Sequence, residues 1–138
     1  MPREFIFVYG TLRKQHGVDA YRALASYCDF FAEGRLNGKL FEVNGYPGDV
    51  ESDNPSENVV GELYLIDSRE ELLSALDEYE ECNDDFPQPH EYIRKKLPVY
   101  LMDGKVVSAW VYVYNRATDV LEEIESGDYL QYDGLKRL

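Results

Sequence analysis

The segment LDEYEE, from Leu76 to Glu81, holds the acidic side chains that could do chemistry, with four carboxylates in six residues. A carboxylate works as a general acid and base at neutral pH when its pKa is raised toward that pH. Burial has this effect, because a poorly solvated position disfavours the charged form. The first question is therefore which of these acids faces the protein interior.

Helical geometry divides these acids into two groups. Ser68 and Glu71 have the spacing of a capping box, so we expect a helix to begin at this point. A step of about 100° per residue then predicts the following buried stripe: Leu72, Leu73, Leu76, Tyr79 and Glu80. Glu78 and Glu81 fall on the opposite, solvent-facing side, and Asp77 falls at the border.

Glu80 is therefore the candidate acid/base. Its inward position and the negative end of the helix dipole both disfavour the charged form, so we expect its pKa to be raised. A glutamate tuned in this way can accept a proton and return it. The alternative is an ordinary surface glutamate, because a side chain in the last turn of a helix can also swing outward into water.

Length and charge narrow the class of protein. The chain has 138 residues, of which 44% are hydrophobic, and this suits one domain spanning residues 1–138. Its 14 Lys and Arg residues are outnumbered by 27 Asp and Glu residues, which gives a net charge of -13. Such a surface repels phosphate backbones and anionic lipids, so we expect neither a nucleic acid nor a membrane as a partner.

Cysteine use and the first apolar run favour a cytoplasmic protein. Cys28 and Cys82 show no CxxC spacing, which fits free thiols in a reducing compartment. The run from Phe5 to Tyr9 is too short for a signal peptide or a membrane span. His16 and His90 belong to no metal-binding motif and the sequence has no nucleotide-binding glycine loop, so we expect no metal and no cofactor.

The sequence predicts a mixture of strands and helices. The run from Phe5 to Tyr9 is typical of a strand buried on both faces. Apolar residues at helical spacing predict a helix from Asp19 to Phe31. Asn37-Gly38 and Asn44-Gly45 each indicate a tight turn, and Asp103-Gly104 indicates a hairpin.

These elements indicate an α+β fold. We expect a mixed, mostly antiparallel sheet of five or six strands, curled into a partial barrel, with two main helices packed on it. A further strand is predicted from Val59 to Ile66, in which Gly61 marks a bulge or a close approach of two backbones. A short helical tail is expected near Val120 to Ile124.

Five short motifs follow one another along the chain. They are Tyr-Gly-Thr-Leu within Val8–Arg13, Val-x-Gly-Glu-Leu-Tyr at Val59–Tyr64, Leu-Asp-x-Tyr-Glu at Leu76–Glu80, Tyr-x-Arg at Tyr92–Arg94, and Ala-Trp-x-Tyr at Ala109–Tyr112. Each motif alone is weak. The ordered set resembles the γ-glutamylcyclotransferase-like family over about Phe5 to Tyr129.

The resemblance implies an activity and a set of site residues. Members of this family convert a γ-glutamyl amide into 5-oxoproline and a free amine, without a cofactor. By resemblance, Glu80 is the acid/base. The resemblance also implies that the substrate, a γ-glutamyl-amine or a γ-glutamyl-amino acid, binds to backbone N–H groups of the loop formed by Tyr9, Gly10, Thr11 and Leu12.

Three more residues complete the candidate substrate-binding set. Tyr46 precedes a proline and could line the pocket or simply form a turn. Tyr92 and Arg94, two apart on a predicted strand, share a face and could orient the loop or Glu80. Core packing with a surface arginine is an equal alternative for this pair.

Two other functions stay open. The fold could serve as a small-molecule binding module without turnover. It could also serve as an amidohydrolase, in which Glu80 activates a water molecule and free glutamate replaces 5-oxoproline.

Overall fold

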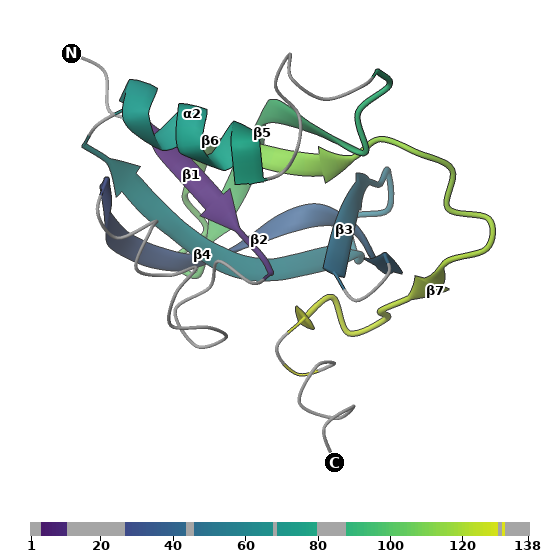
Figure 1. Ribbon diagram of the computed structural model, residues 1–138. Coiled ribbons are helices and arrows are strands. Elements are labelled where there is room, and N and C mark those ends of the chain that lie inside the picture. Colours follow the sequence, from purple (N-terminus) through teal and green to yellow (C-terminus); the bar gives the residue numbers. More distant parts are fainter. Residues whose placement is uncertain are drawn as a thin grey trace.

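The computed structural model describes residues 4–10, 27–43, 46–67, 69–79, 88–129 and 131, and its described part is built around a closed β-barrel (Figure 1). The barrel strands, in the order of their pairing, are β2 (Cys28–Val43), β4 (Asn58–Ile66), β1 (Phe5–Val8), β6 (Val106–Tyr114) and β5 (Tyr92–Leu101). Pairing of β5 back onto β2 closes the ring. Two further strands, β3 (Tyr46–Glu51) and β7 (Glu122–Glu123), extend from β2.

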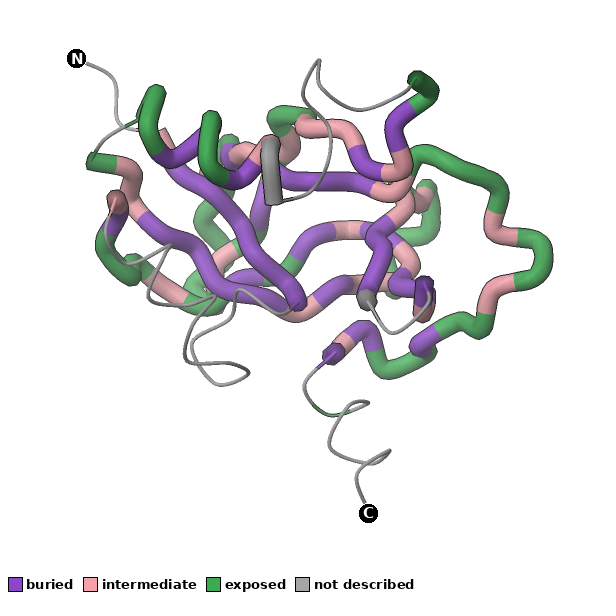
Figure 2. Tube along the Cα trace, in the orientation of Figure 1, coloured by how far each residue is buried: buried purple, intermediate pink, exposed green. Residues whose placement is uncertain are grey.

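The strand β1 lies between β4 and β6 in the barrel. It pairs antiparallel with β4 and parallel with β6, and all four of its side chains are buried. Figure 2 shows this buried character along the whole of β1. The predicted strand with two buried faces is therefore confirmed, and so is the mixed, mostly antiparallel character of the sheet.

The helix α2 (Arg69–Tyr79) lies across one side of the barrel, over β1 (Figure 1). It packs through Leu72, Leu73 and Leu76, each no more than 4% exposed, against a cluster that contains Ile6 and Tyr112. These leucines confirm the predicted stripe, and Asp77 is half-buried, as its border position predicted. Ser68 and the side chain of Tyr79 lie outside the described residues.

The structure corrects the predicted helix from Asp19 to Phe31. Residues 28–31 form the start of β2, where Cys28 pairs with Ile66, while residues 19–26 lie outside the described part of the chain. Phe30 packs edge-on against Tyr64, and Phe31 contacts Phe5. The apolar spacing of this short segment was compatible with a helix. In the structure, pairing with β4 supplies hydrogen bonds for its backbone and also brings its aromatic rings into contact with neighbouring rings.

The turn signals had different outcomes. The hairpin at Asp103-Gly104 is confirmed, because β5 and β6 pair on either side of it and Gly104 has a φ of 88°. On either side of Asn44-Gly45, β2 and β3 pair antiparallel, as a turn there requires. The predicted turn at Asn37-Gly38 is wrong, since β2 runs through both residues, pairing with β4 at Asn37 and with β3 at Gly38.

The described residues are mostly β rather than α+β, and other parts of the predicted fold class also need correction. The barrel is closed rather than partial, because β5 pairs with β2. The sheet has seven strands among the described residues, and α2 is the only helix longer than a single turn in that part of the chain. The helical tail near Val120 to Ile124 is wrong, because Glu122–Glu123 forms β7 and the amide of Ile124 donates to the carbonyl of Leu40 at 2.7 Å.

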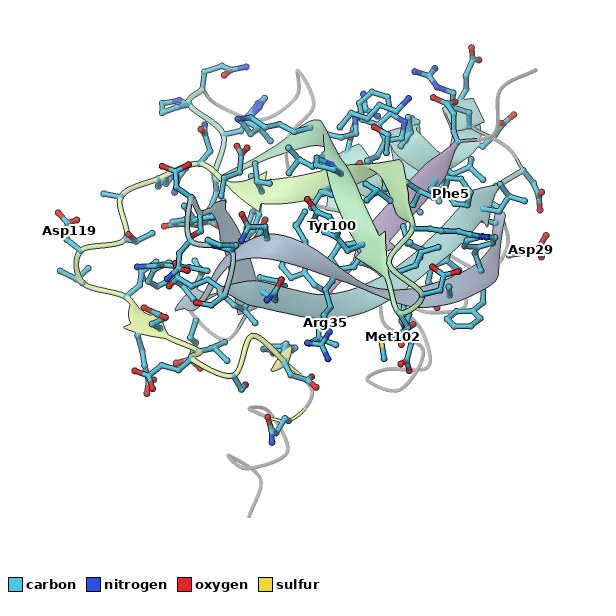
Figure 3. The ribbon with its side chains drawn as sticks, turned by 180° about the vertical axis from the view of Figure 1, so that it is seen from behind. Phe5, Asp29, Arg35, Tyr100, Met102 and Asp119 are labelled. Carbon is cyan, nitrogen blue, oxygen red and sulfur yellow. The ribbon has the colours of Figure 1, made fainter. Side chains whose placement is uncertain are left out.

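A few large hydrophobic side chains are exposed to solvent among the described residues. Figure 3 shows two of these, Tyr100 and Met102, on the hairpin that joins β5 to β6. Within the described ranges, no helix is both long enough and apolar enough to cross a membrane.

Candidate active site

The first part of the candidate site lies at the end of β1, where Tyr9 anchors the chain. Its side chain is buried, and its hydroxyl donates to the carbonyl of Tyr112 and accepts from the amide of Asp49, with 3.2 Å between N and O. The phenol is thus occupied inside the protein. The hydroxyl of Tyr9 therefore holds the end of β1 against β6 and β3.

Gly10 follows Tyr9 and lies directly against β3. A Cβ atom placed on Gly10 would overlap Cγ of Pro47, so no larger residue fits without movement. The carbonyl of Pro47 in turn accepts a hydrogen bond of 2.8 Å from the hydroxyl of Tyr92. The structure therefore brings Gly10 and Tyr92 to the same residue. Glycine permits this close approach because it has no side chain.

The structure leaves three predicted loop and pocket residues wholly or partly undescribed. Thr11 and Leu12 lie outside the described residues. Tyr46 is the first residue of β3 and precedes Pro47, but its side chain is not described. Its place in the chain keeps it next to the Gly10 contact, and its role in the pocket stays a prediction.

The second part of the candidate site is the end of α2. Asp77, in the last turn, accepts a hydrogen bond of 2.6 Å from the hydroxyl of Tyr112 on β6. Its other carboxylate oxygen lies 3.5 Å from Nη1 of Arg94. The guanidinium of Arg94 also lies over the ring of Trp110, 5.0 Å from the ring centre. Arg94 therefore contacts the helix, whereas Tyr92 contacts β3.

Glu80 is the next residue after the end of α2 and lies outside the described residues. Its inward orientation and its role as acid/base therefore stay predictions. The structure describes the chain only as far as Tyr79, the residue before Glu80.

The structure also reveals a buried acid that the sequence did not single out. Asp49 is fully buried on β3, and its carboxylate oxygens make no hydrogen bond within the described part of the chain. Burial, and to a lesser extent the charge of Glu51, raises the pKa of Asp49 to about 8. Its carboxylate occupies the space above Gly38, where a Cβ atom would overlap it. The segment around Asp49 resembled a turn, so nothing in its pattern indicated an inward-facing acid.

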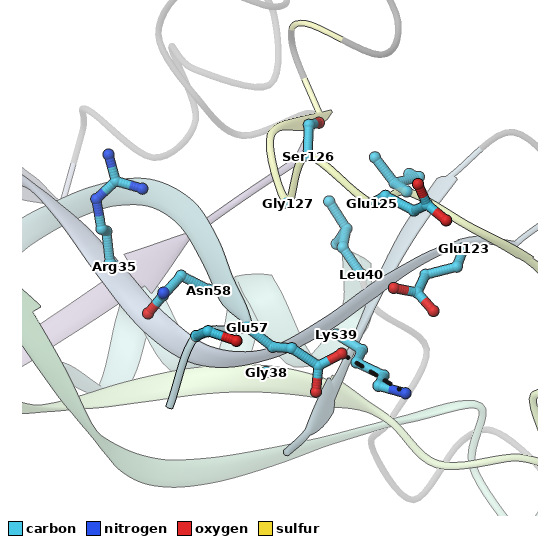
Figure 4. Close-up of a pocket in the computed structure, with 12 residues that line it drawn as sticks. Arg35, Gly38, Lys39, Leu40, Glu57, Asn58, Glu123, Glu125, Ser126 and Gly127 are labelled. Carbon is cyan, nitrogen blue, oxygen red and sulfur yellow. Dashed lines mark ion pairs between the residues drawn. The ribbon is translucent and has the colours of Figure 1, made fainter. Parts of the chain in front are cut away.

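A pocket of about 180 Å³ lies elsewhere, between β2 and the segment that follows β7 (Figure 4). Its walls are mainly polar and include the ion pair between Lys39 and Glu57, with 3.6 Å between the charged atoms. Neither Gly10 nor Arg94 lines it. Among the described residues, none that the sequence predicted for the site lines this pocket.

Comparison with known proteins agrees with the resemblance. The family described as gamma-glutamyl cyclotransferase, AIG2-like, matches residues 6–131. A protein of Methanocaldococcus jannaschii, provisionally named a gamma-glutamylcyclotransferase, is 36% identical over 132 residues, which cover 95% of this chain and 99% of the relative. The gamma-glutamylcyclotransferase family protein YtfP of Escherichia coli K12 is 35% identical over 128 residues, covering 93% and 97%.

A solved structure supports the fold as well. The crystal structure of an AIG2-like protein from Mus musculus superimposes with a TM-score of 0.70 at 26% identity, covering 91% of this chain and 88% of that protein. The family match spans nearly the whole chain, including β1, α2 and the β5–β6 hairpin. The chain therefore belongs to the AIG2-like gamma-glutamyl cyclotransferase family.

Proposed function

We propose that this protein is a cofactor-free cyclotransferase that converts a γ-glutamyl amide into 5-oxoproline and a free amine. The observation that carries the proposal is the double role of Tyr112. Its carbonyl accepts from Tyr9 at the end of β1, and its hydroxyl donates to Asp77 at the end of α2. One residue thus connects the strand that leads into the Gly10 loop with the helix that leads into Glu80.

The proposed reaction takes place within one substrate molecule. The α-amino nitrogen attacks the γ-carbonyl carbon, a C–N bond closes the five-membered ring, and the C–N bond to the departing amine breaks. Glu80 accepts a proton from the α-ammonium group and delivers it to the departing nitrogen. The second proton, which the ring nitrogen loses after attack, leaves with the amine, which departs as an ammonium ion. Because nucleophile and electrophile belong to one molecule, holding them in a ring-closing geometry supplies much of the acceleration.

The loop that begins at Gly10 provides the proposed electrostatic stabilisation of the reaction. Backbone N–H groups of Gly10, Thr11 and Leu12 bind either the substrate carboxylate or the oxyanion that develops on the γ-carbonyl. A single donor to such an oxyanion is worth about 3 kcal/mol in comparable sites. The contact between Gly10 and Pro47 supports this role, because it fixes where the loop leaves β1.

The test is a panel of γ-glutamyl-amines and γ-glutamyl-amino acids, with 5-oxoproline measured by mass spectrometry. We expect turnover of at least one class and a loss of about 100-fold or more in kcat for Glu80→Gln. The control is Glu71→Gln, which makes the same change at an exposed acid of α2 and should leave kcat unchanged. Activity that survives Glu80→Gln would remove Glu80 from the mechanism.

The same panel separates the alternatives. Free glutamate in place of 5-oxoproline would indicate an amidohydrolase. Saturable binding by calorimetry, with neither product, would indicate a binding module. We propose the cytoplasm as the compartment, because two cysteines without CxxC spacing fit a reducing environment.

A further inference from the structure

The end of α2 is poorly stabilised by the helix itself. The last turn of any helix leaves backbone carbonyls without partners and carries the negative end of the dipole, which favours basic side chains. This helix has no basic residue in its last turn, and Asp77 adds a negative charge there. Contacts from outside the helix must therefore hold this turn in place.

Two strands provide those contacts. The distance of 2.6 Å between the hydroxyl of Tyr112 and Oδ1 of Asp77 falls in the range of charge-assisted O–H···O⁻ bonds, about 2.5 to 2.7 Å. Arg94 of β5 approaches Oδ2 of the same carboxylate at 3.5 Å, and the ring of Trp110 lies beneath its guanidinium. Both carboxylate oxygens of Asp77 are thus tied to the barrel wall.

The attachment of Asp77 to the barrel bears on the position of Glu80, because the two residues are three apart in the sequence. α2 ends at Tyr79, so the chain enters Glu80 directly from the turn that carries Asp77. A displacement of about 1 Å at a reacting group can cost on the order of 100-fold in rate. We infer that Asp77 and Tyr112 are positioning residues, which fix the last turn of α2 on the barrel and so set the geometry of Glu80. This inference rests on the proposed function.

Tyr112 is suited to this role because its hydroxyl and its carbonyl bind two different parts of the site. Its hydroxyl holds the helix, while its carbonyl holds Tyr9 at the end of β1. The separation between the two parts of the site therefore depends on one residue of β6. A residue that only filled the core would have no such directed bonds.

Tyr112→Phe is the direct test, because it removes the hydroxyl and keeps both the ring and the carbonyl. We expect kcat to fall roughly 10- to 100-fold with little change in KM. The matched control is Tyr64→Phe. Tyr64 belongs to the same core cluster and donates a bond of 2.7 Å to the carboxylate of Glu62, but neither residue lies on α2. This control should lower Tm by a similar amount and leave kcat near that of the wild type.

Variants of Asp77 supply a second measurement. Asp77→Asn keeps an acceptor for Tyr112, so it should retain more kcat than Asp77→Ala. In a Glu80→Gln background, Tyr112→Phe should cause no further loss, because the residue acts through Glu80. A wild-type kcat in Tyr112→Phe, or an equal loss with and without Glu80, would overturn the inference.

Hydrogen exchange separates this inference from the proposed function. The amides of residues 76–79 should exchange faster in Tyr112→Phe than in Tyr64→Phe. If the wild-type protein turned over no γ-glutamyl amide, the proposed function would fail, and with it the catalytic part of the inference. Equal exchange in the two variants would show that Tyr112 does not hold the helix end, whatever the activity.

Discussion

At the scale of single residues, the least expected feature is a fully buried carboxyl group on β3. Asp49 is completely buried and bonds to no described group through its carboxylate, while its amide holds the phenol of Tyr9. Burial of this kind favours the neutral form, and the nearby charge of Glu51 acts in the same direction. The acid therefore couples stability to pH at a residue that supports the end of β1.

The sign of this coupling follows from the pKa of about 8 in the folded protein and the value of 3.8 expected for an ordinary aspartate. Between these values the folded state keeps the proton of Asp49 and the unfolded chain has lost it. The stability from this group is full below the lower value and is lost as pH rises to about 8. The slope approaches about 1.4 kcal/mol per pH unit in that window.

We therefore predict that Asp49→Asn flattens the decline of the free energy of unfolding with pH. The amide has nearly the same shape and does not ionise, so the variant should be more stable than the wild type at about pH 8 and above. Urea titrations across this range provide the measurement. Asp53→Asn, at an exposed position, is the control and should keep the wild-type slope. A parallel slope in Asp49→Asn would contradict a buried neutral acid.

At the scale of elements, the sequence predicted those parts that depend on local signals. β1, the leucine stripe of α2 and the hairpin at Asp103-Gly104 were recognisable, because burial on two faces, helical period and turn chemistry each leave a local pattern. The start of β2 was misread, since the apolar spacing of residues 28–31 was also compatible with a helix.

The site follows the same division. The motifs identified Tyr9, Gly10 and Arg94 by type, and the helix count set Asp77 at the border of the buried stripe. They did not predict that Tyr112 would join Asp77 to Tyr9, because these two contacts span 35 and 103 residues of the chain. Contacts of this length depend on the closure of the barrel, which no local pattern encodes.

The contact between Gly10, just after β1, and Pro47 of β3 gives a prediction at this scale. In Gly10→Ala the new Cβ would overlap Pro47, so the end of β1 must move away from β3. We expect a loss of about 1 to 3 kcal/mol in stability, as for other overpacked sites, and a fall in kcat/KM for the proposed reaction. Thermal unfolding and steady-state kinetics measure the two effects.

The same contact provides the control. Pro47→Ala makes room for the added methyl group, so Gly10→Ala with Pro47→Ala should recover stability relative to Gly10→Ala alone. Additive losses in the double variant would show that the two residues do not compete for the same space.

At the scale of the whole molecule, the segment after β7 completes the barrel interior. Ile124 and Tyr129 are buried in the same cluster as Tyr9 and Leu40, although they come from the far end of the described chain. The carbonyl of Gly127 accepts a hydrogen bond of 2.8 Å from the amide of Val60 on β4, beside the end of β1. The interior therefore depends on the docking of this late segment as well as on the strands.

Two glycines with positive φ test this dependence. Gly127 has a φ of 69° and lies so close to β4 that a Cβ atom would overlap the carbonyl of Asn58. Gly104, in the β5–β6 turn, has a φ of 88° with nothing near its Cβ position. An alanine at either position carries the conformational cost of the left-handed region, roughly 1 kcal/mol, and only Gly127→Ala adds a clash with the backbone.

We therefore predict that Gly104→Ala lowers the free energy of unfolding by about 1 kcal/mol and that Gly127→Ala lowers it by clearly more. Urea unfolding followed by circular dichroism and by the fluorescence of Trp110, the only tryptophan, measures both variants. If the late segment is part of the cooperative unit, the two probes should shift together in Gly127→Ala. If Gly127→Ala kept the wild-type unfolding transition in Trp110 fluorescence, the barrel would fold stably without this segment.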